Sequence, residues 1–573
     1  MMKFILREKI RKIFVGLNIF YKQNALMKIN FSMKKRVLIT LSALLVFFVV
    51  VRIIFFGFGP LKIFNIINSQ ERPNLILISI DSLGTNHVSA YGYHRKTTPN
   101  IDKLAEEGVL FRNFIAQSYL TPVSAGALHT GTYPTTNGII NFDTLLSDNF
   151  LTLAQILKNF NYKTIAMGTN PEYAKDFSLS DAGFQNFNRG FDVYGFRSGE
   201  ENSKKYRHLP DINEVFYYLK NNKKSPYFLW LSLGSVHWPY GRFSDTSYFV
   251  NKNYEGFLKK DKLFSKGLWS GLGQIYNKTF FSVHHPAFYH YDFKQIDEEI
   301  ELSREDIQYI IDSYDDGIIN TDLWLGRFLG RLKEEGFDRN TIIILTAEHG
   351  EEWGEHGYFM HADIYEPAVR APFIIRYPGL NKWSSAIETQ VQSIDVLPTI
   401  LDFLEIKKPH WIEGESLTPL IYGKENDGFN RYVFIERIPL IEHVLGRDAE
   451  AQARRLQSYP PFYLEFQKLD KENHYRDVAV RKENEWKLIY RKSRDVEKKY
   501  SWWNFLTGKT VKDPPEFELY NLKSDPLEKE NLYGKPETEI IFQELKEKLM
   551  SWLADRENKK IPPRMVEPIQ EYF

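Results

Sequence analysis

The sequence predicts an α/β protein with a central, mostly parallel sheet sandwiched by helices, a smaller antiparallel-sheet subdomain near the C-terminus and one transmembrane helix near the N-terminus. Short apolar runs that stop at polar residues predict buried parallel strands, and helical patterns alternate with these runs. A basic segment and a long apolar stretch open the chain, and the 573 residues include no cysteine. The absence of cysteine excludes disulfides, thiolate metal sites, iron–sulfur clusters and a cysteine nucleophile.

The net charge of +1 is the sum of two very different parts of the chain. Residues 1–36 carry ten Lys and Arg side chains and one acid, a net charge of +9, whereas the remaining residues carry −8. The near-neutral total favours no nucleic-acid partner, because such partners are bound by basic surfaces. The pattern instead predicts a basic tail joined to a mildly acidic protein.

Residues 37–58 form the predicted transmembrane signal anchor. At 1.5 Å per residue, a helix of this length crosses a hydrocarbon core of roughly 30 Å. Its one charged residue, Arg52, stands in the last third and can extend to the interface. Three basic residues, 34–36, precede the span, so the positive-inside rule places the basic tail, 1–36, in the cytoplasm.

The rest of the chain is therefore expected outside the cytoplasm, in a periplasmic or extracellular space, with residues 59–72 as a short stalk. A cleaved signal peptide is the alternative, but no small-residue cleavage site follows the apolar run. The exterior part is expected to divide into a larger domain at 73–430 and a C-terminal subdomain at 431–573.

Three short apolar runs, at 75–80, 227–233 and 341–346, predict central strands of the larger domain. Helical patterns at 101–108 and 312–336 lie between them. Strands that alternate with helices in this way are typical of a parallel sheet covered by helices.

Polar side chains follow each of these predicted strands. Asp81 follows the first strand, His237 the second, and Glu348 and His349 the third. Ligands of open α/β sheets bind beyond the carboxyl ends of the strands, so these residues are expected to meet. The segment 349–361 adds three His and three Glu, which predicts a metal site. Structural roles for each residue and a solvated acidic loop are the alternatives.

The C-terminal subdomain is predicted from two apolar runs and one helical pattern. Residues 478–481 and 486–491 are expected to form antiparallel strands. Apolar residues recur at helical spacing within 537–556, so this helix is expected to pack on the sheet. The expected apolar residues of the helix are Ile540, Ile541, Leu545, Leu549, Trp552 and Leu553.

The segment 73–138 resembles the N-terminal signature of sulfatase-like enzymes in the alkaline phosphatase superfamily. The likeness continues in order along the chain and covers nearly all of residues 73–555. It includes the motifs RGFD at 189–192, SVHWPY at 235–240, YDDGIINTDLWLGRFL at 314–329, TAEHGEEWGEHGYFMHADIYEPAVRAPFIIRYPG at 346–379, IDVLPTILDFL at 394–404, GESLTPLI at 414–421, WKLIY at 486–490 and ELYNLKSDPLEKENL at 518–532.

The resemblance implies an alkaline-phosphatase-like fold and a set of site residues. Thr121 stands at the first position of the family's nucleophile motif, anchored on Ser124 and on the Thr-Gly pair at 130–131. His237 and His361 match positions that hold basic groups contacting the oxyanion. One divalent metal ion is implied, with Zn²⁺, Mn²⁺ or Mg²⁺ suiting the oxygen and nitrogen ligands and Ca²⁺ less favoured by an imidazole. The implied metal ligands are Asp81, Thr121, Glu348 and His349.

The chemistry of Thr121 is consistent with this role. A threonine hydroxyl is a poor nucleophile at neutral pH, and coordination to a divalent ion lowers the pKa of a bound hydroxyl. A helix N-terminus adds N–H donors near a bound anion. The two histidines could neutralise charge or protonate a leaving oxygen. The structural alternative makes Thr121 a helix cap, with Pro122 at the first helical position.

Thr121 also departs from the family's usual pattern. True sulfatases use formylglycine made from Cys or Ser, and its geminal diol lets the sulfated intermediate collapse. A threonine side chain cannot supply that aldehyde. Thr at this position resembles the phosphoethanolamine transferases, phosphoglycerol transferases and nucleotide phosphodiesterases of the same superfamily, which form a phosphorylated Thr.

Four further departures lie near the predicted site. Val123 replaces the usual Pro and Ala125 the usual Arg of the motif, and Ser82 stands where many sulfatases have a second Asp. Glu348 replaces the usual Asp, which moves the carboxylate by about one methylene, on the order of 1.5 Å. These departures bear on metal identity and on activity.

The favoured function is a membrane-anchored, metal-dependent hydrolase or transferase of phospho- or sulfo-esters on an envelope lipid or glycan, with phosphodiester chemistry or phospho-group transfer preferred. One alternative is a sulfatase that works without formylglycine, and another is an inactive sulfatase-like binding protein. An aromatic- and His-rich stretch at 264–293 is a candidate insertion facing substrate or membrane, with a packed peripheral loop as its alternative.

Overall fold

The computed structural model describes residues 72–558, which belong to one compact unit, Glu71–Phe573. The predicted tail, anchor and most of the stalk lie outside the described residues. No helix within the described ranges is both long and apolar enough to cross a bilayer. The internal gaps in the description are 141–143, 169–185, 197–208, 222–224, 238–239, 241–245, 257, 259–269, 276–277, 284–298, 302, 357–358, 362, 379, 381–385, 425–431, 438–476 and 492–514.

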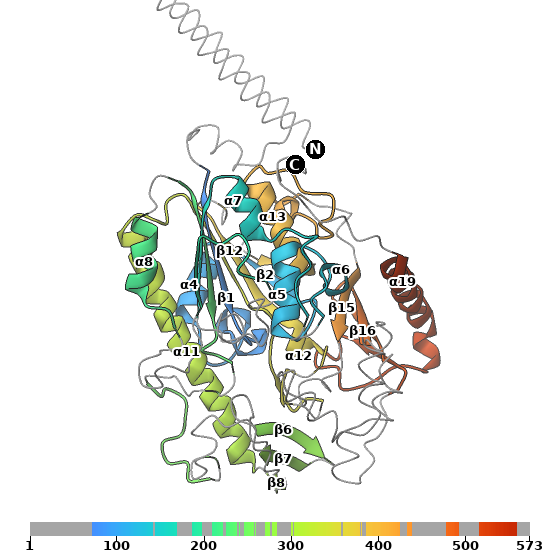
Figure 1. Cartoon of the computed structure of the whole chain (residues 1–573). Helices are drawn as coiled ribbons and strands as arrows, with labels where there is room; N and C mark the ends of the chain where they lie inside the picture. The colour runs from blue at the N-terminus through green and yellow to red at the C-terminus, as the bar shows by residue number, and fades with distance from the viewer. Residues whose placement is uncertain are drawn as a thin grey trace, which may run out of the picture. The chain divides into compact units, whose positions relative to one another are not determined.

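A nine-stranded, mostly parallel sheet forms the centre of the larger part (Figure 1). Its strand order is β13-β2-β12-β9-β1-β5-β3-β4, with β14 also paired to β2. Only β12 runs antiparallel to its two neighbours among the described strands of this sheet. The strands are β1 Asn74–Ile80, β2 Val109–Ile115, β3 Lys163–Gly168, β4 Val193–Phe196, β5 Tyr227–Leu233, β9 Thr341–Thr346, β12 Arg370–Arg376, β13 Ala386–Ile387 and β14 Val391–Gln392.

The three strands predicted from apolar runs occupy the middle of this sheet. β1 pairs in parallel with β5 on one side and with β9 on the other, so that Leu75 lies between Phe228 and Ile342. All residues of β5 and β9 are buried, as expected for strands covered on both faces. The parallel register brings the carboxyl ends of all three strands to one edge.

Helices cover both faces of the sheet (Figure 1). One layer contains α4, α8 and α11, and the other contains α5, α7 and α13. α11 is longer than predicted because Ser303 and Asp306 form a capping box that starts it eight residues earlier than the apolar pattern. The helices are α4 Pro99–Glu106, α5 Thr121–Thr130, α6 Pro134–Asn137, α7 Leu153–Asn159, α8 Ile212–Lys220, α11 Arg304–Glu334, α12 Glu366–Val369, α13 Val396–Phe403 and α14 Thr418–Ile421.

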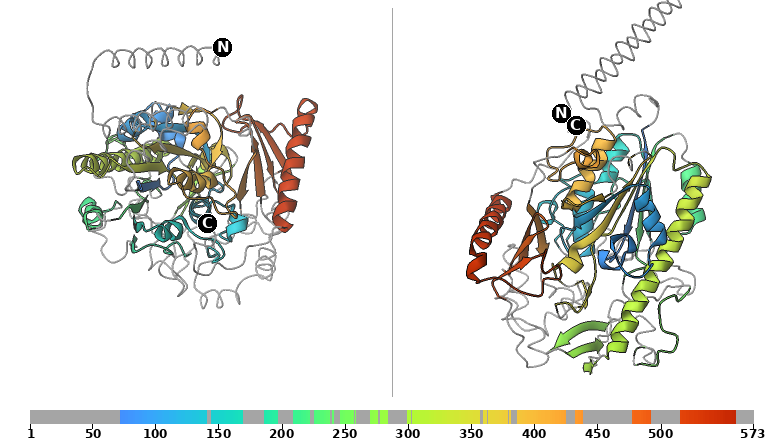
Figure 2. Two further views of the ribbon diagram at one scale, coloured as in Figure 1. Left: turned by 90° about the horizontal axis from the view of Figure 1, so that it is seen from above. Right: turned by 180° about the vertical axis from the view of Figure 1, so that it is seen from behind.

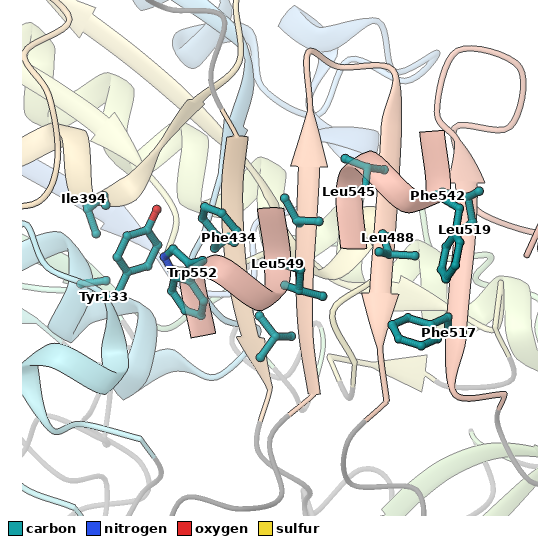
Figure 3. Close-up of a cluster of buried hydrophobic side chains, with 13 residues drawn as sticks. Tyr133, Ile394, Phe434, Leu488, Phe517, Leu519, Phe542, Leu545, Leu549 and Trp552 are labelled. Atoms are coloured by element: carbon teal, nitrogen blue, oxygen red, sulfur yellow. The ribbon is translucent and has the colours of Figure 1, made fainter. Parts of the chain in front are cut away.

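A separate four-stranded antiparallel sheet, with strand order β15-β16-β17-β18, confirms the predicted C-terminal sheet. Its strands are β15 Tyr432–Arg437, β16 Asp477–Lys482, β17 Trp486–Tyr490 and β18 Phe517–Asn521, and α19 Glu539–Asn558 lies along it (Figure 2). Leu545, Leu549 and Trp552 of α19 pack against Leu488 and Leu519 of the sheet, as predicted (Figure 3).

One residue of the predicted apolar face of α19 was placed wrongly. Ile540 is 87% exposed, whereas Phe542 is buried in the core. At 3.6 residues per turn, position 540 falls on the face of α19 opposite to Phe542 and Leu549, so its side chain points away from the sheet.

A three-stranded sheet is formed by β6 Ser270–Ile275, β7 Lys278–Val283 and β8 Glu299–Glu301. β6 and β7 belong to the candidate insertion at 264–293, whose side chains lie outside the described residues. A contact of this insertion with substrate or membrane stays a prediction.

Candidate active site

Asp81 follows β1 at the carboxyl edge of the sheet and is 2% exposed. The next residue, Ser82, has φ of 59°, a left-handed conformation that is strained for a non-glycine residue. Tyr314 of α11 holds this turn, because its hydroxyl donates to the Ser82 carbonyl at 2.6 Å and accepts from the Gly84 N–H at 3.0 Å. The turn that follows Asp81 is therefore held by hydrogen bonds to α11, a helix far away in the sequence.

Thr121 is the first residue of α5 and is 1% exposed. The N-cap is Leu120, which makes no side-chain capping bond, and Pro122 lies in the first turn. The hydroxyl of Thr121 contacts side chains of the site instead of capping the helix. The helix-cap alternative for Thr121 is thus wrong, because the extended Leu120 takes the cap position.

Thr121, Asp81 and His349 form a buried triangle. The Thr121 Oγ1 atom lies 2.9 Å from His349 Nε2 and donates to Asp81 Oδ1 at 3.3 Å. His349 Nε2 is also 3.3 Å from Asp81 Oδ1. His349 Nδ1 donates to the Gly350 carbonyl at 2.9 Å, which orients the ring with Nε2 toward Thr121. Residues 228 positions apart in the chain therefore meet through one hydrogen bond.

The charges of Asp81 and His349 depend on each other. Burial alone raises the pKa of Asp81, but the charges of His237, His349 and His361 hold it below its usual range. Burial alone lowers the pKa of His349, but the hydrogen bond and charge of Asp81 raise it to about 9. A cation bound by Nε2 would have to displace the proton there, since metal ligands bind deprotonated.

Glu348 is 3% exposed, and neither of its carboxylate oxygens accepts a hydrogen bond of normal geometry, although the Ser79 hydroxyl lies near enough to oppose the rise of its pKa. Burial raises its pKa to about 8, and the neighbouring charge of Asp81 adds to the shift. The possible ligands are the carboxyl groups of Asp81 and Glu348, the hydroxyl of Thr121 and the imidazole of His349. This set of oxygen and nitrogen donors suits a divalent cation. Across the described ranges, no three His, Asp or Glu side chains already stand at metal-binding spacing. The fit therefore rests on the donor chemistry and on the unpartnered oxygens of Glu348.

His361 and His237 complete the predicted set. The His361 ring centre lies 4.1 Å from that of His349 and 5.2 Å from that of His237. Burial and the two neighbouring imidazoles lower the pKa of His361 well below its usual value. The structure thus brings Asp81 and His349 to the hydroxyl of Thr121, and the ring contacts of His361 link His349 to His237.

Glu351 is a site residue for which the sequence predicted no role. It is fully buried, and its Oε1 atom lies 3.0 Å from His361 Nδ1. Burial raises its pKa to about 8, although the charges of His237 and His349 oppose the shift. The only signal in the sequence was the excess of Glu and His in the segment that contains it.

A second Glu–His pair ties this segment to the C-terminal part. His356 Nδ1 lies 2.8 Å from Glu352 Oε1, and its Nε2 lies 2.8 Å from the Leu527 carbonyl. The ring stacks on Tyr365 with centres 3.6 Å apart. The segment that carries His361 is therefore tied to the C-terminal part through His356.

A mostly parallel sheet with a helix N-terminus, buried carboxyl groups and histidines gathered at its strand ends defines the alkaline phosphatase-like class of proteins. The model of the Sulfatase family matches residues 73–406, more than half of the chain, and the chain therefore belongs to the sulfatase family.

Curated relatives cover most of this chain. An N-acetylglucosamine-6-O-sulfatase of Bacteroides thetaiotaomicron is 24% identical over 536 residues, covering 82% of this chain and 84% of the relative. An ulvan-active sulfatase of Formosa agariphila is 25% identical over 496 residues, covering 85% of this chain and 82% of the relative.

Solved structures share the fold. The phosphonate monoester hydrolase of Agrobacterium radiobacter has a TM-score of 0.59 at 20% identity, covering 85% of this chain and 96% of its own. A second structure, in complex with its substrate D-glucosamine-2-N,6-O-disulfate, has a TM-score of 0.58 at 20% identity, covering 86% and 100%.

Proposed function

We propose that this protein hydrolyses sulfate or phosphate esters and that Thr121 is the nucleophile. One observation carries the proposal: the hydroxyl of Thr121 is buried at the start of α5, 2.9 Å from His349 Nε2 and 3.3 Å from Asp81 Oδ1. A hydroxyl held between an imidazole and a carboxyl at a helix N-terminus has the surroundings of an activated nucleophile. Family membership supports the same class of reaction.

The reaction begins when the Thr121 hydroxyl passes its proton to Asp81 Oδ1, to which it donates, and its oxygen bonds to the sulfur or phosphorus of the ester. The bond to the leaving oxygen breaks, its electron pair stays on that oxygen, and a proton from a histidine neutralises it. His361 and His237, in contact with each other beside His349, are placed to supply that proton. The backbone N–H groups of the first turn of α5 stabilise the anionic group during the transfer. A water molecule then bonds to the sulfur or phosphorus and gives a proton to the histidine that lost one, and the bond to Thr121 breaks as its oxygen regains a proton from Asp81.

A divalent cation belongs to the proposal because the donors fit it. Asp81, Thr121, Glu348 and His349 would hold the ion, and the buried, unpartnered oxygens of Glu348 support that assignment. When bound, such an ion lowers the pKa of a coordinated hydroxyl and offsets negative charge on the ester. The ligand types favour Zn²⁺, Mn²⁺ or Mg²⁺, and Ca²⁺ also occurs with carboxylate ligands.

Two observations favour different ester types. Two curated relatives are named as an N-acetylglucosamine-6-O-sulfatase and an ulvan-active sulfatase. These names favour hydrolysis of a sulfate ester on a glycan. Thr121 favours phosphorus, because threonine cannot form the aldehyde that releases sulfate in formylglycine enzymes. Transfer of a phospho-group to a second alcohol on an envelope lipid or glycan remains a narrower proposal that rests on Thr121 alone. The N-terminal pattern supports a single-pass anchor at 37–58 that holds the catalytic part outside the cytoplasm.

The test compares substrates and one matched pair of variants in the full-length protein. Purified protein with Zn²⁺, Mn²⁺, Mg²⁺ or Ca²⁺ is assayed on an aryl sulfate, a glucosamine 6-sulfate, a phosphomonoester and a phosphodiester. Thr121→Ala is expected to abolish turnover, whereas Thr121→Ser, which keeps a hydroxyl, retains part of it. Mass spectrometry should find the trapped sulfo- or phospho-group on the peptide that contains Thr121.

Each contrary result points to a different alternative. Equal turnover by Thr121→Ala would exclude Thr121 as nucleophile. Substrate binding without turnover under every metal would identify an inactive binding protein. Turnover of phosphodiesters alone, with transfer to an added alcohol, would favour the transferase over the hydrolase.

A further inference from the structure

We infer that Glu351 is a positioning residue that fixes the ring of His361, so that His361 Nε2 is the nitrogen that acts on the leaving oxygen of the ester. The inference rests on the proposed function and adds a residue and a definite nitrogen atom to it.

The contact between the two side chains is short and almost fully enclosed. Glu351 Oε1 lies 3.0 Å from His361 Nδ1, and the two side chains are 0% and 10% exposed. A carboxyl group and one imidazole nitrogen at this distance share a proton, whichever of the two carries it. Whichever group carries the shared proton, the hydrogen bond to Glu351 engages Nδ1. Only Nε2 can therefore contact a substrate.

The backbone explains why these two residues meet. β10 Glu352–Trp353 and β11 Phe359–Met360 form a two-stranded antiparallel hairpin in which Glu352 pairs with Met360. One step beyond that pair, Glu351 and His361 stand opposite each other. Neighbouring positions across antiparallel strands bring side chains into direct contact. The register of the hairpin therefore sets the Glu351–His361 pair.

The chain leaves the hairpin through a bent backbone at the same place. Met360 has φ of 72°, in the left-handed region that non-glycine residues rarely adopt. Strained residues of this kind persist where the surrounding structure holds them, and they cluster at active sites. The bend directs the next residue, His361, toward His349, with the two ring centres 4.1 Å apart.

A rotated His361 ring would be unfavourable for a simple reason. Turning the ring to expose Nδ1 would break its contact with Glu351 and leave a fully buried carboxyl group without that partner. The neighbouring rings of His349 and His237 also flank His361 and limit its orientation. A lysine at position 361 has a single nitrogen, which could not bond to Glu351 and act on the ester at the same time. The arrangement therefore requires the two nitrogens of an imidazole.

The role in the reaction follows from the orientation. As the bond between the leaving oxygen and the sulfur or phosphorus breaks, its electron pair remains on the oxygen, which takes the proton that His361 carries on Nε2. The proton shared with Glu351 then stays on Nδ1, so the ring ends neutral and the carboxyl group ends as a carboxylate. The carboxyl group of Glu351 keeps the hydrogen bond to Nδ1 throughout. Esters of weakly acidic alcohols depend on this proton most, whereas 4-nitrophenolate leaves without it.

The first experiment compares two leaving groups in the full-length protein. Glu351→Gln is expected to lower kcat on an alkyl ester about 10- to 100-fold, with KM and turnover of the 4-nitrophenyl ester changed less than about threefold. His361→Ala should show the same preference, and adding Glu351→Gln to it should have no further effect. Glu355→Gln, a carboxyl change elsewhere in the hairpin, is the matched control and should leave both rates unchanged. Equal losses on both esters, or additive losses in the double variant, would overturn the inference.

A second measurement needs no turnover. In protein labelled with ¹⁵N-histidine, the His361 signals are identified by their absence in His361→Ala, and Glu351→Gln is expected to shift both nitrogens. Unchanged His361 signals would refute the contact. Retained turnover in Thr121→Ala, by contrast, would overturn the proposed nucleophile and leave this result standing.

Discussion

Lys487 and Glu528 form an ion pair at 2.9 Å in which both side chains are fully buried. Lys487 lies on β17 and also contacts Glu366 of α12 at 3.3 Å. The antiparallel sheet is thus joined to the larger part by charges that water does not screen. Removing one member of such a pair leaves an uncompensated buried charge, which destabilises a protein far more than the loss of a surface pair.

The first prediction concerns this ion pair. Lys487→Met is expected to lower the free energy of unfolding by about 3–5 kcal/mol, because Glu528 remains buried without its cation, whereas Glu366 keeps Arg481 at 3.1 Å. Denaturant unfolding monitored by circular dichroism would measure the change. The control is Lys523→Met, whose partner Glu485 is paired at 2.9 Å but whose side chain is 65% exposed. That change should cost less than about 1 kcal/mol, and equal effects of the two variants would contradict the prediction.

The second prediction concerns pH and His129. This residue of α5 is 1% exposed, packs edge-on against Trp230, and burial lowers its pKa to about 3. Between about pH 6.5 and pH 3, His129 is therefore protonated in the unfolded state but neutral in the folded state. The free energy of unfolding consequently falls as the pH drops below about 6.5. At pH 5 the loss from this residue is about 2 kcal/mol.

His129→Phe should remove that part of the acid sensitivity between pH 6.5 and 5, as measured by unfolding at several pH values. His410→Gln, at an exposed histidine, is the control and should leave the slope unchanged. An unchanged slope in His129→Phe would show that other groups cause the acid sensitivity.

The third prediction concerns the turn that aims Asp81. Tyr314→Phe removes the hydroxyl that bonds to both the Ser82 carbonyl and the Gly84 N–H, so it should cost about 1–3 kcal/mol of stability. Turnover should fall as well, since Asp81 precedes Ser82 directly. Thermal unfolding and initial rates test both effects, with Tyr217→Phe, at a residue 62% exposed, as the neutral control. Wild-type rates in Tyr314→Phe would show that the turn holds its shape without the hydroxyl.

The fourth prediction concerns the cation. A ligand that binds only the folded state at 100 times its Kd stabilises it by about 2.7 kcal/mol, so the chosen divalent ion should raise Tm. Glu348→Gln should abolish that rise while leaving Tm without metal the same or higher, because it removes a buried, unpartnered carboxyl group. Scanning calorimetry with and without metal tests the pair of effects, with Glu355→Gln keeping the full rise as the control. A full metal-dependent rise in Glu348→Gln would remove Glu348 from the ligand set.

Much of the site was predictable because it follows local patterns. Asp81 and His349 come just after apolar runs that became β1 and β9, and parallel strands bring such residues to one edge. The helix that begins at Thr121 was also expected. The family resemblance implied that Thr121 shares a site with Asp81 and His349, but not the direct hydrogen bonds between them, which depend on how α5 packs beside two strands far away in the sequence.

Other features had no local signal. The pairing of Glu351 with His361 depends on the register of a two-residue hairpin, which is too short to leave a periodic pattern. The apolar residues of α19 lie on more than one face of the helix, and only the structure shows that Phe542 faces the sheet while Ile540 faces outward.

The sequence by itself determined the fold class, the central strands, the family and the residues that gather at the strand ends. The fold class and the strands follow from the order of apolar and polar residues, which selects secondary structure and burial locally, whereas the family follows from the resemblance of motifs such as SVHWPY at 235–240. Only the tertiary structure decided which atoms meet: Thr121 with His349, Glu351 with His361, and Lys487 with Glu528. The physical reason is that the direction of a buried side chain is set by packing between segments far apart in the chain, whose contacts leave no trace in the local pattern of residues.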